Sequence, residues 1–354
     1  MQKLEHPDKT GYRLKLIVLA AAFVATLLCS VIFGRYNVGI LDLAKILINR
    51  LLEFIGKIIG TPLGLNKTWS SAAETVALKV RMPRIISATV IGAALSTAGV
   101  SYQGMFRNPM VSPDILGAST GAGFGAALGI LVGFNYVGIT ALSFCFGLGA
   151  VFLAYSISRV SRLNATLSMV LSGIMVGSLF SAGTSFIKLF ADTNNQLPAI
   201  TYWLMGSLSS IKGGDAVFVT ILVLVGILPL ILLRWRINLL TVSEDEAKSL
   251  GINSGRLRFI IVVCATLMTA AAVSVSGMIG WVGLVIPHFC RLIFGYDYKR
   301  LIPASILLGG AFMTIVDDLA RLATTAEIPL GILTAFVGAP VFIWLILRNN
   351  GSDE

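Results

Sequence analysis

Apolar segments long enough to cross a membrane recur along this chain, and they limit its fold more than any other feature. We count ten, at about 14–33, 84–106, 114–134, 136–157, 166–190, 215–233, 257–278, 281–294, 301–323 and 331–347. About 20 apolar residues in a helix span the roughly 30 Å hydrocarbon core of a bilayer. Charged residues make up only 12% of the chain, about half their usual share in soluble domains. The sequence therefore predicts an all-α polytopic membrane protein with one transmembrane domain over residues 1–354.

Two other apolar stretches are not expected to cross. Residues 198–212 look like a helix that is too short to span. Residues 34–80 form a long connection in which apolar side chains recur as in an amphipathic helix lying along the membrane surface. These side chains are Leu41, Ile46, Leu47, Leu51, Leu52 and Phe54.

The basic residues are distributed unevenly over the connections. With the N-terminus in the cytoplasm, the inner segments hold sixteen Lys and Arg, and the short outer connections hold only Lys188, Lys212 and Arg321. Cytoplasmic loops of membrane proteins carry such an excess of positive charge, although long connections do not follow the rule. We therefore expect both termini in the cytoplasm. The basic residues lie singly, without interleaved aromatic residues, so no nucleic-acid partner is expected.

The longest polar stretch between apolar segments covers residues 241–258. Ser243 and Glu246 match a capping box, and Gly251 stands where a helix commonly ends. The pattern predicts a short cytoplasmic helix of about two turns. Such a helix could fit the groove of a partner, and a solvated loop between two spans is the simpler alternative.

Charged residues also stand at the outer ends of two spans. Arg81 and Arg84 flank Pro83 at the start of the second span, where they either anchor the helix at the membrane surface or bind a partner. Asp317 and Arg321 are four residues apart, which places them on one helix face and predicts an intrahelical ion pair. That pair competes with a recognition role for Arg321.

No group of residues indicates that the chain itself catalyses a reaction or binds a cofactor. There is no G-x-x-x-x-G-K-[ST] sequence, so ATP cannot bind here in the P-loop manner. The histidines are His6 and His288, and a metal site needs several converging ligands. The four cysteines are scattered, without C-x-x-C spacing. We expect no catalytic residue, no metal and no cofactor.

A series of motifs that follow one another along the chain is the most specific signal in the sequence. It begins with Arg81-Met82-Pro83-Arg84 and continues through Gln103, Phe106, Asn108-Pro109, Pro113-Asp114 to Gly121, Leu250-Gly251-Ile252, Gly283 to His288 with Arg291, Asp317 to Arg321, Glu327 to Gly331 and Gly338-Ala339-Pro340. This order resembles the FecCD-type permease subunits of bacterial ABC type II importers for iron–siderophore, haem and cobalamin. The resemblance covers about residues 80–347.

The resemblance implies a homodimeric permease of ten spans in the cytoplasmic membrane of a bacterium or archaeon. Two ATP-binding cassette ATPase subunits would dock below it, and an extracytoplasmic binding protein would deliver the substrate. A weak inverted repeat fits this architecture, since spans two to five and seven to ten each reach a Gly-Met pair, Gly104-Met105 and Gly277-Met278. An offset of five spans, an odd number, inverts the second unit in the membrane.

The resemblance also implies three sets of functional residues. Arg81, Arg84 and Arg321 would receive glutamates from the two lobes of the binding protein. Spans five and ten would line the pathway with small, weakly polar residues such as Ser172, Gly173 and Ser178. The cytoplasmic stretch would insert into the ATPase subunits through Ser243, Glu244, Asp245, Glu246, Ala247, Leu250 and Gly251.

The substrate expected from the resemblance is an iron chelate, with a siderophore complex placed before haem or cobalamin. Oxyanions such as molybdate are the alternative with the same architecture. An ion-driven secondary transporter usually needs ionisable residues near mid-membrane, which spans three to seven almost lack. A membrane-embedded enzyme would need a polar catalytic cluster, and the sequence shows none.

Overall fold

The computed structural model describes residues 9–161, 164–241 and 253–349, and within these ranges it contains helices and no strand. Each predicted apolar span overlaps one helix. These helices are α1 (Lys9–Ile32), α4 (Met82–Phe106), α5 (Ala118–Val132), α6 (Tyr136–Val160), α7 (Ala165–Phe190), α9 (Gly213–Leu240), α11 (Ser254–Ser276), α12 (Val282–Phe294), α13 (Tyr298–Leu322) and α14 (Leu330–Asn349).

Seven helical stretches in the described part of the chain are long and apolar enough to cross a membrane. Three others, Ala118–Val132, Val282–Phe294 and Leu330–Trp344, are apolar but shorter. The chain is therefore an all-helical, multi-pass membrane protein. Ten crossings remain a prediction, because the three shorter helices approach or fall below the length that a full span needs.

The connections contain the shorter elements α2 (Ile40–Ile59), α3 (Ser71–Thr75), a π-helical segment η1 (Val76–Arg81), a 3₁₀ turn η2 (Pro113–Leu116) and α8 (Gln196–Met205). The surface helix predicted within residues 34–80 is present as α2. The helix predicted at 198–212 is shorter than expected, since Gly206 takes a φ of +78° and ends α8 after Met205.

Helix α4 lies at the centre of the bundle and packs against α9, α11, α12 and α13. Two of its glycines make this close approach possible. Gly92 faces the backbone of Gly309 in α13, and Gly99 faces the backbone of Gly283 in α12, so a Cβ atom at either position would collide with main-chain atoms. Small residues at helix contacts allow this kind of backbone packing in membrane proteins.

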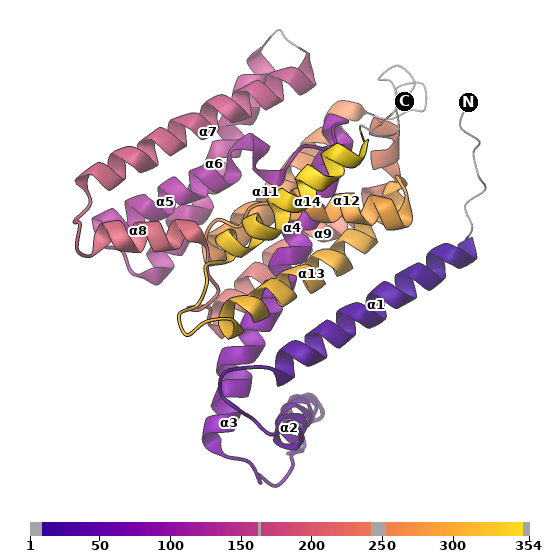
Figure 1. Cartoon of the computed structure of the whole chain (residues 1–354), viewed down its shortest axis with the longest axis vertical. Helices are drawn as coiled ribbons and strands as arrows, with labels where there is room; N and C mark the ends of the chain where they lie inside the picture. Colours follow the sequence, from indigo (N-terminus) through magenta and orange to yellow (C-terminus); the bar gives the residue numbers. More distant parts are fainter. Residues whose placement is uncertain (1–8, 162–163, 242–252, 350–354) are drawn as a thin grey trace.

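Figure 1 shows how the other helices surround this centre. Helices α5 to α8 form one side of the molecule, and α1 lies along the opposite side, where it packs on α13. Helix α2 is seen nearly end-on beside α3, whereas α1 is seen lengthwise. Helix α2 therefore runs across the direction of α1, as expected for a helix on the membrane surface.

Helices α3, η1 and α4 form one continuous helical stretch, Ser71–Phe106, of 36 residues. It begins where the Ser70 hydroxyl accepts a hydrogen bond from the amide of Ala73 at 3.1 Å, which caps the first turn. The sequence predicted a span from residue 84 only. The helix starts earlier because Ser70 supplies a cap that the apolar pattern does not reveal.

Candidate functional site

The three arginines expected to receive a binding protein lie at one end of the bundle, which we call the arginine end. It is formed by the last turn of α1, the end of η1 with the first turn of α4, and the last turn of α13. Arg81, Arg84 and Arg321 are only 4%, 8% and 6% exposed. Buried guanidinium groups need partners, so their contacts decide what they can do.

Arg81 caps the C-terminal end of α1. Its Nη1 donates to the carbonyl oxygens of Val31 at 3.0 Å and Ile32 at 3.3 Å, and its Nη2 donates to the carbonyl oxygen of Tyr36. The last carbonyls of a helix lack partners within the helix, and a cation there also complements the helix dipole. Gly34 leaves room for the guanidinium, since a Cβ atom at that position would collide with Arg81.

Arg84 joins α4 to α13 and to the turn that follows it. Its Nε lies 2.9 Å from both carboxylate oxygens of Asp317, and its Nη2 lies 2.9 Å from Oδ1 of the same residue. Its Nη1 lies 2.9 Å from Oε1 of Glu327. Asp317 is 1% exposed, so this forked contact is what allows its carboxylate to be buried.

The intrahelical pair predicted between Asp317 and Arg321 is wrong. Arg321 instead pairs with Asp318, and its Nη2 donates to the carbonyl oxygen of Ser30 at 2.8 Å. The Ser30 hydroxyl donates to Oδ1 of Asp318 at 2.7 Å. Asp317 faces α4 and Asp318 faces α1, so neighbouring carboxylates on α13 serve different arginines.

The arginine end also depends on Arg35, which the sequence analysis did not single out. Its guanidinium donates to the carbonyl oxygens of Arg321 at 2.6 Å, Thr324 at 2.6 Å and Thr325 at 2.9 Å. These carbonyls close the last turn of α13 and the segment after it. Arg35 therefore caps α13 in the way that Arg81 caps α1, and a basic residue just after an apolar span was the available signal.

The arrangement excludes one of the two interpretations of Arg81 and Arg84. A membrane-surface anchor extends its charge into the lipid headgroups, whereas both side chains are buried among groups of the same chain. Together, the arginines hold the ends of α1, α4 and α13 in place. Any acidic partner that reached them would have to compete with these internal acceptors.

The opposite end of the bundle holds the boundaries of the predicted coupling stretch. The residues named for coupling, Ser243 to Ala247 with Leu250 and Gly251, lie outside the described residues. Helix α9 ends at Leu240, whose carbonyl oxygen accepts a hydrogen bond from Nε of Arg107 at 2.7 Å. Helix α11 begins after Asn253, whose side chain accepts from the amide of Arg256 at 2.9 Å.

Several residues of the recognised motifs meet at this same end. The side-chain nitrogen Nε2 of Gln103 donates to the carbonyl oxygen of Val111 at 3.1 Å, and the Oε1 atom of Gln103 accepts from Arg291. Asn238 donates to Asp297 at 2.7 Å and accepts from the amide of Tyr298 at 2.9 Å. These contacts connect the ends of α4, α9 and α12 with the start of α13. Gln103 and Arg291 are thus structural groups to which the sequence analysis gave no role.

The residues predicted to line a pathway do not share one face of α7. Ser172 and Gly173 are buried, and a Cβ atom on Gly173 would collide with the carbonyl oxygen of Ile115 in η2. Ser178 is exposed. Within this single chain, Gly173 lies against η2, and Ser172 is buried next to it in α7. Small residues suit both purposes, so the sequence could not distinguish packing from lining.

A wide-open cavity of about 600 Å³ lies beside α14, the tenth predicted span. Its walls are mainly apolar and come from the end of α8, the α11–α12 connection and α14. The large side chains among them are Leu204, Met205, Met278, Trp281, Ile332 and Phe336. Among the residues that the structure describes, no group of three or more His, Cys, Asp or Glu side chains could hold a metal ion.

Comparisons with known proteins agree over nearly the whole chain. The model of the FecCD transport family matches residues 22–348. The molybdate import system permease protein MolB of Haemophilus influenzae is 36% identical over 98% of this chain and 99% of its own length. The probable iron chelatin transport system permease protein of Helicobacter pylori is 38% identical over 96% of this chain and 99% of its own.

Solved structures support the same relationship. A protein assigned as a metal-chelate type ABC transporter, solved in an inward-facing conformation, has a TM-score of 0.82, 35% identity, and coverage of 94% of this chain and 98% of that one. PsaBC from Streptococcus pneumoniae, at 18% identity and a TM-score of 0.51, indicates similarity of fold alone. Because the family model and two relatives cover almost the whole length, the chain belongs to the FecCD transport family of ABC-importer permeases.

Proposed function

We propose that the chain is the transmembrane subunit of an ATP-driven importer that moves an iron chelate to the cytoplasm, with a siderophore complex placed before haem or cobalamin. The observation that carries the proposal is the 38% identity to the iron chelatin permease protein over 96% of this chain. A cobalamin import permease of Halobacterium salinarum and the haemin transport permease HmuU of Yersinia pestis align over only 77% and 80% of it.

Molybdate is the second candidate, because MolB aligns over 98% of the chain. The cavity beside α14 favours a chelate over an oxyanion. Its walls present Met278, Trp281 and Phe336, and no basic side chain is among its lining residues. An organic chelate can bury apolar surface against these walls, whereas a bare oxyanion would meet no basic side chain on them.

The proposed assembly has two copies of this chain, two ATPase subunits and an extracytoplasmic binding protein. Each copy would cross the membrane ten times with both termini in the cytoplasm. ATP hydrolysis would take place in the ATPase subunits, which would bind residues 241–258. Movement there would reach α9 directly, and it would reach α4 through the contact of Arg107 with the Leu240 carbonyl, 2.7 Å long.

We place the docking of the binding protein at the arginine end, where Arg81, Arg84 and Arg321 lie. Glu327 is the most accessible of the carboxylates there, with 28% of its side chain exposed, and its Oε2 has no hydrogen-bond partner among the described residues. A glutamate of the binding protein would replace Glu327 on Arg84. Docking would then exchange an internal ion pair for one between the two proteins.

Exchange at Arg84 gives the docking proposal a direct test. Glu327→Gln removes the competing carboxylate, so the binding protein should bind this variant more tightly than the wild type. Arg84→Glu also breaks the buried pair with Asp317, so its loss of binding supports docking only where lysine substitutions of acidic residues on one lobe of the binding protein restore part of it. Unchanged affinity in both permease variants, measured at low and moderate salt, would remove Arg84 from the docking site.

Transport assays test the function as a whole. The permease, its ATPase subunits and its binding protein are reconstituted in vesicles, and uptake of a radioiron-labelled siderophore is compared with uptake of labelled molybdate. We expect chelate uptake that requires ATP. Saturable molybdate uptake without chelate uptake would establish the second candidate. Uptake driven by an ion gradient without ATP would contradict the importer class.

A further inference from the structure

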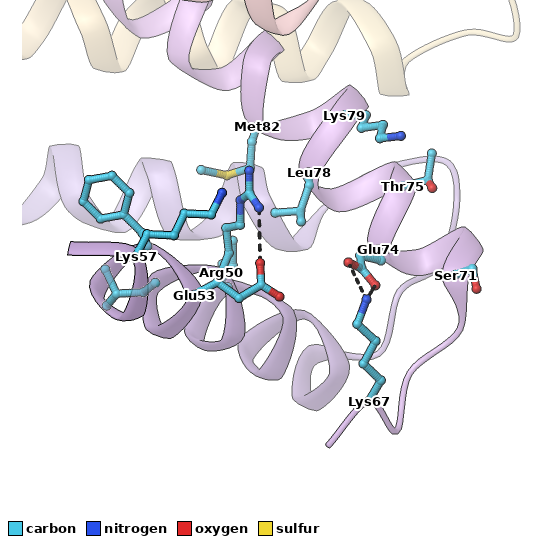
Figure 2. A pocket seen from close by; sticks show the side chains of 13 residues that line it. Arg50, Glu53, Lys57, Lys67, Ser71, Glu74, Thr75, Leu78, Lys79 and Met82 are labelled. Carbon is cyan, nitrogen blue, oxygen red and sulfur yellow. Dashed lines mark hydrogen bonds and ion pairs between the residues drawn. The ribbon is translucent and has the colours of Figure 1, made fainter. Parts of the chain in front are cut away.

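A groove of about 800 Å³ lies between α2 and the helical stretch formed by α3 and η1 (Figure 2). Its apolar lining comes from both sides. Leu47, Leu51 and Phe54 belong to α2, whereas Leu78 belongs to η1 and Met82 is the first residue of α4, which continues the facing stretch. This groove is distant in sequence from the cavity beside α14 and shares no lining residue with it.

The same groove carries an excess of positive charge. Arg50 pairs with Glu53 at 3.2 Å, and Lys67 pairs with Glu74 at 3.2 Å, so both carboxylates that line the groove are neutralised. Lys57 and Lys79 also line it, and neither has an ion pair or hydrogen bond with any residue that the structure describes. In Figure 2, the side chains of Arg50 and Lys57 extend from α2 toward Met82.

The position of the groove relative to a membrane follows from helix length. Ser71–Phe106 has 36 residues, which makes about 54 Å of helix at about 1.5 Å per residue, against a hydrocarbon core of roughly 30 Å. Glu74, Lys79, Arg81 and Arg84 all lie in the first part of this stretch, so this end extends beyond the core. The groove therefore lies outside the hydrocarbon core, on the side where the lipid headgroups are.

Helix α2 has an apolar face that nothing in the described chain covers. Leu41, Ile48, Leu51, Phe54 and Ile58 recur at helical spacing, and each is more than half exposed. Amphipathic helices with such a face lie in the membrane interface, where the apolar side chains enter the acyl region. Leu51 and Phe54 belong to both the exposed face and the groove wall, so the groove opens toward the lipid.

We propose that this groove binds an anionic phospholipid. The lipid phosphate lies beside Lys57 and Arg50, whose guanidinium keeps donors free beyond its contact with Glu53. Lys79 adds positive charge at the rim, and an acyl chain lies along Leu51 and Phe54. The groove combines an apolar wall with unpaired cations on the headgroup side of the core, which matches both parts of such a lipid.

Lipid retention by the purified permease–ATPase complex tests the charge recognition. The complex is equilibrated in nanodiscs of equal phosphatidylglycerol and phosphatidylcholine, extracted in mild detergent, and its retained lipids are counted by native mass spectrometry. We expect the wild type to enrich phosphatidylglycerol. In the variant Lys57→Gln/Lys79→Gln, each of the two substitutions should weaken phosphatidylglycerol binding about fivefold. Equal retention of the two lipids by the wild type would overturn the proposal.

A matched control separates the groove from the overall charge of the protein. Lys45→Gln/Lys188→Gln removes the same charge from α2 and α7 at positions that do not line the groove, where Lys45 contacts Thr68 at 3.2 Å. This variant should retain phosphatidylglycerol as the wild type does. An equal loss in the control would show unspecific attraction and would contradict a site at the groove.

A second pair of measurements distinguishes a lipid from a soluble anion. Leu51→Ser/Phe54→Ser changes two exposed side chains, so it should fold normally and still lose phosphatidylglycerol. Millimolar glycerol 3-phosphate should not displace the lipid, because it lacks the acyl chains. Full retention in the serine variant, or displacement by glycerol 3-phosphate, would show a site for soluble anions and overturn the lipid assignment.

Discussion

Removing the guanidinium of Arg84 should destabilise the permease itself. Three nitrogen–oxygen distances of 2.9 Å join it to Asp317, which is 1% exposed. In Arg84→Gln the carboxylate of Asp317 stays buried without a cation. Breaking a buried pair in this way costs about 3–5 kcal/mol of unfolding free energy. Loss of the contact with Glu327, which is 28% exposed, adds at most about 1 kcal/mol.

A double-mutant cycle measures this pair without reference to any partner protein. Thermal unfolding of the purified permease in detergent is followed for Arg84→Gln, Asp317→Asn and the combined variant. The combined variant should be more stable than Arg84→Gln, because it contains no unpaired buried charge, with a coupling energy of about 1–3 kcal/mol. Arg50→Gln is the control, since Arg50 forms an exposed pair whose loss should cost under about 1 kcal/mol.

The cycle separates two roles of Arg84. If the pair holds the fold, stability falls in Arg84→Gln whether or not a binding protein is present. Wild-type unfolding in Arg84→Gln, together with lost association of the binding protein, would refute the structural reasoning. Arg84 would then serve docking alone, and its contact with Asp317 would contribute nothing to the stability of the bundle.

Three further predictions concern topology, coupling and packing. In a background without native cysteines, Asn135→Cys should react with an impermeant thiol reagent added outside cells and Ser249→Cys should not; reversed labelling would invert the proposed orientation. Gly251→Val should distort the end of the short helix at a local cost on the order of 1 kcal/mol and leave a folded permease that associates poorly with its ATPase. Normal transport by this variant would show that residues 241–258 are only a loop. Gly99→Val should prevent folding, because its side chain would meet the backbone of α12, whereas Gly149→Ala, which has open space, should not lower thermal stability.

The helices could be predicted from the sequence because each depends on a local pattern. Apolar runs located the spans, and the amphipathic spacing between residues 34 and 80 located α2. Boundaries set by single side chains or glycines were missed. Examples are the Ser70 cap that starts the long stretch before α4 and Gly206, which ends α8 early.

The partners of the charged residues could not be predicted, because they come from distant parts of the chain. Arg84 and Asp317 are 233 positions apart, so helical spacing offered Arg321 as the only visible partner for Asp317. The same limit applies to Ser172 and Gly173, whose small size fits both a pathway and a tight contact. The position of η2 against α7 shows the tight contact of Gly173, and a lining role for these residues stays a prediction.

The contacts at the arginine end suggest how docking could act on the rest of the bundle. Arg84 connects α4 with α13, and Arg81, the last residue of η1 directly before α4, connects this stretch with the end of α1. A glutamate that replaced an internal acceptor would therefore change how α4 is held against both neighbours. Helix α4 continues without interruption to Phe106, and the next residue, Arg107, contacts the last carbonyl of α9. One helix thus connects the proposed docking end with the helix that leads into residues 241–258, so a change at either end can alter contacts at the other.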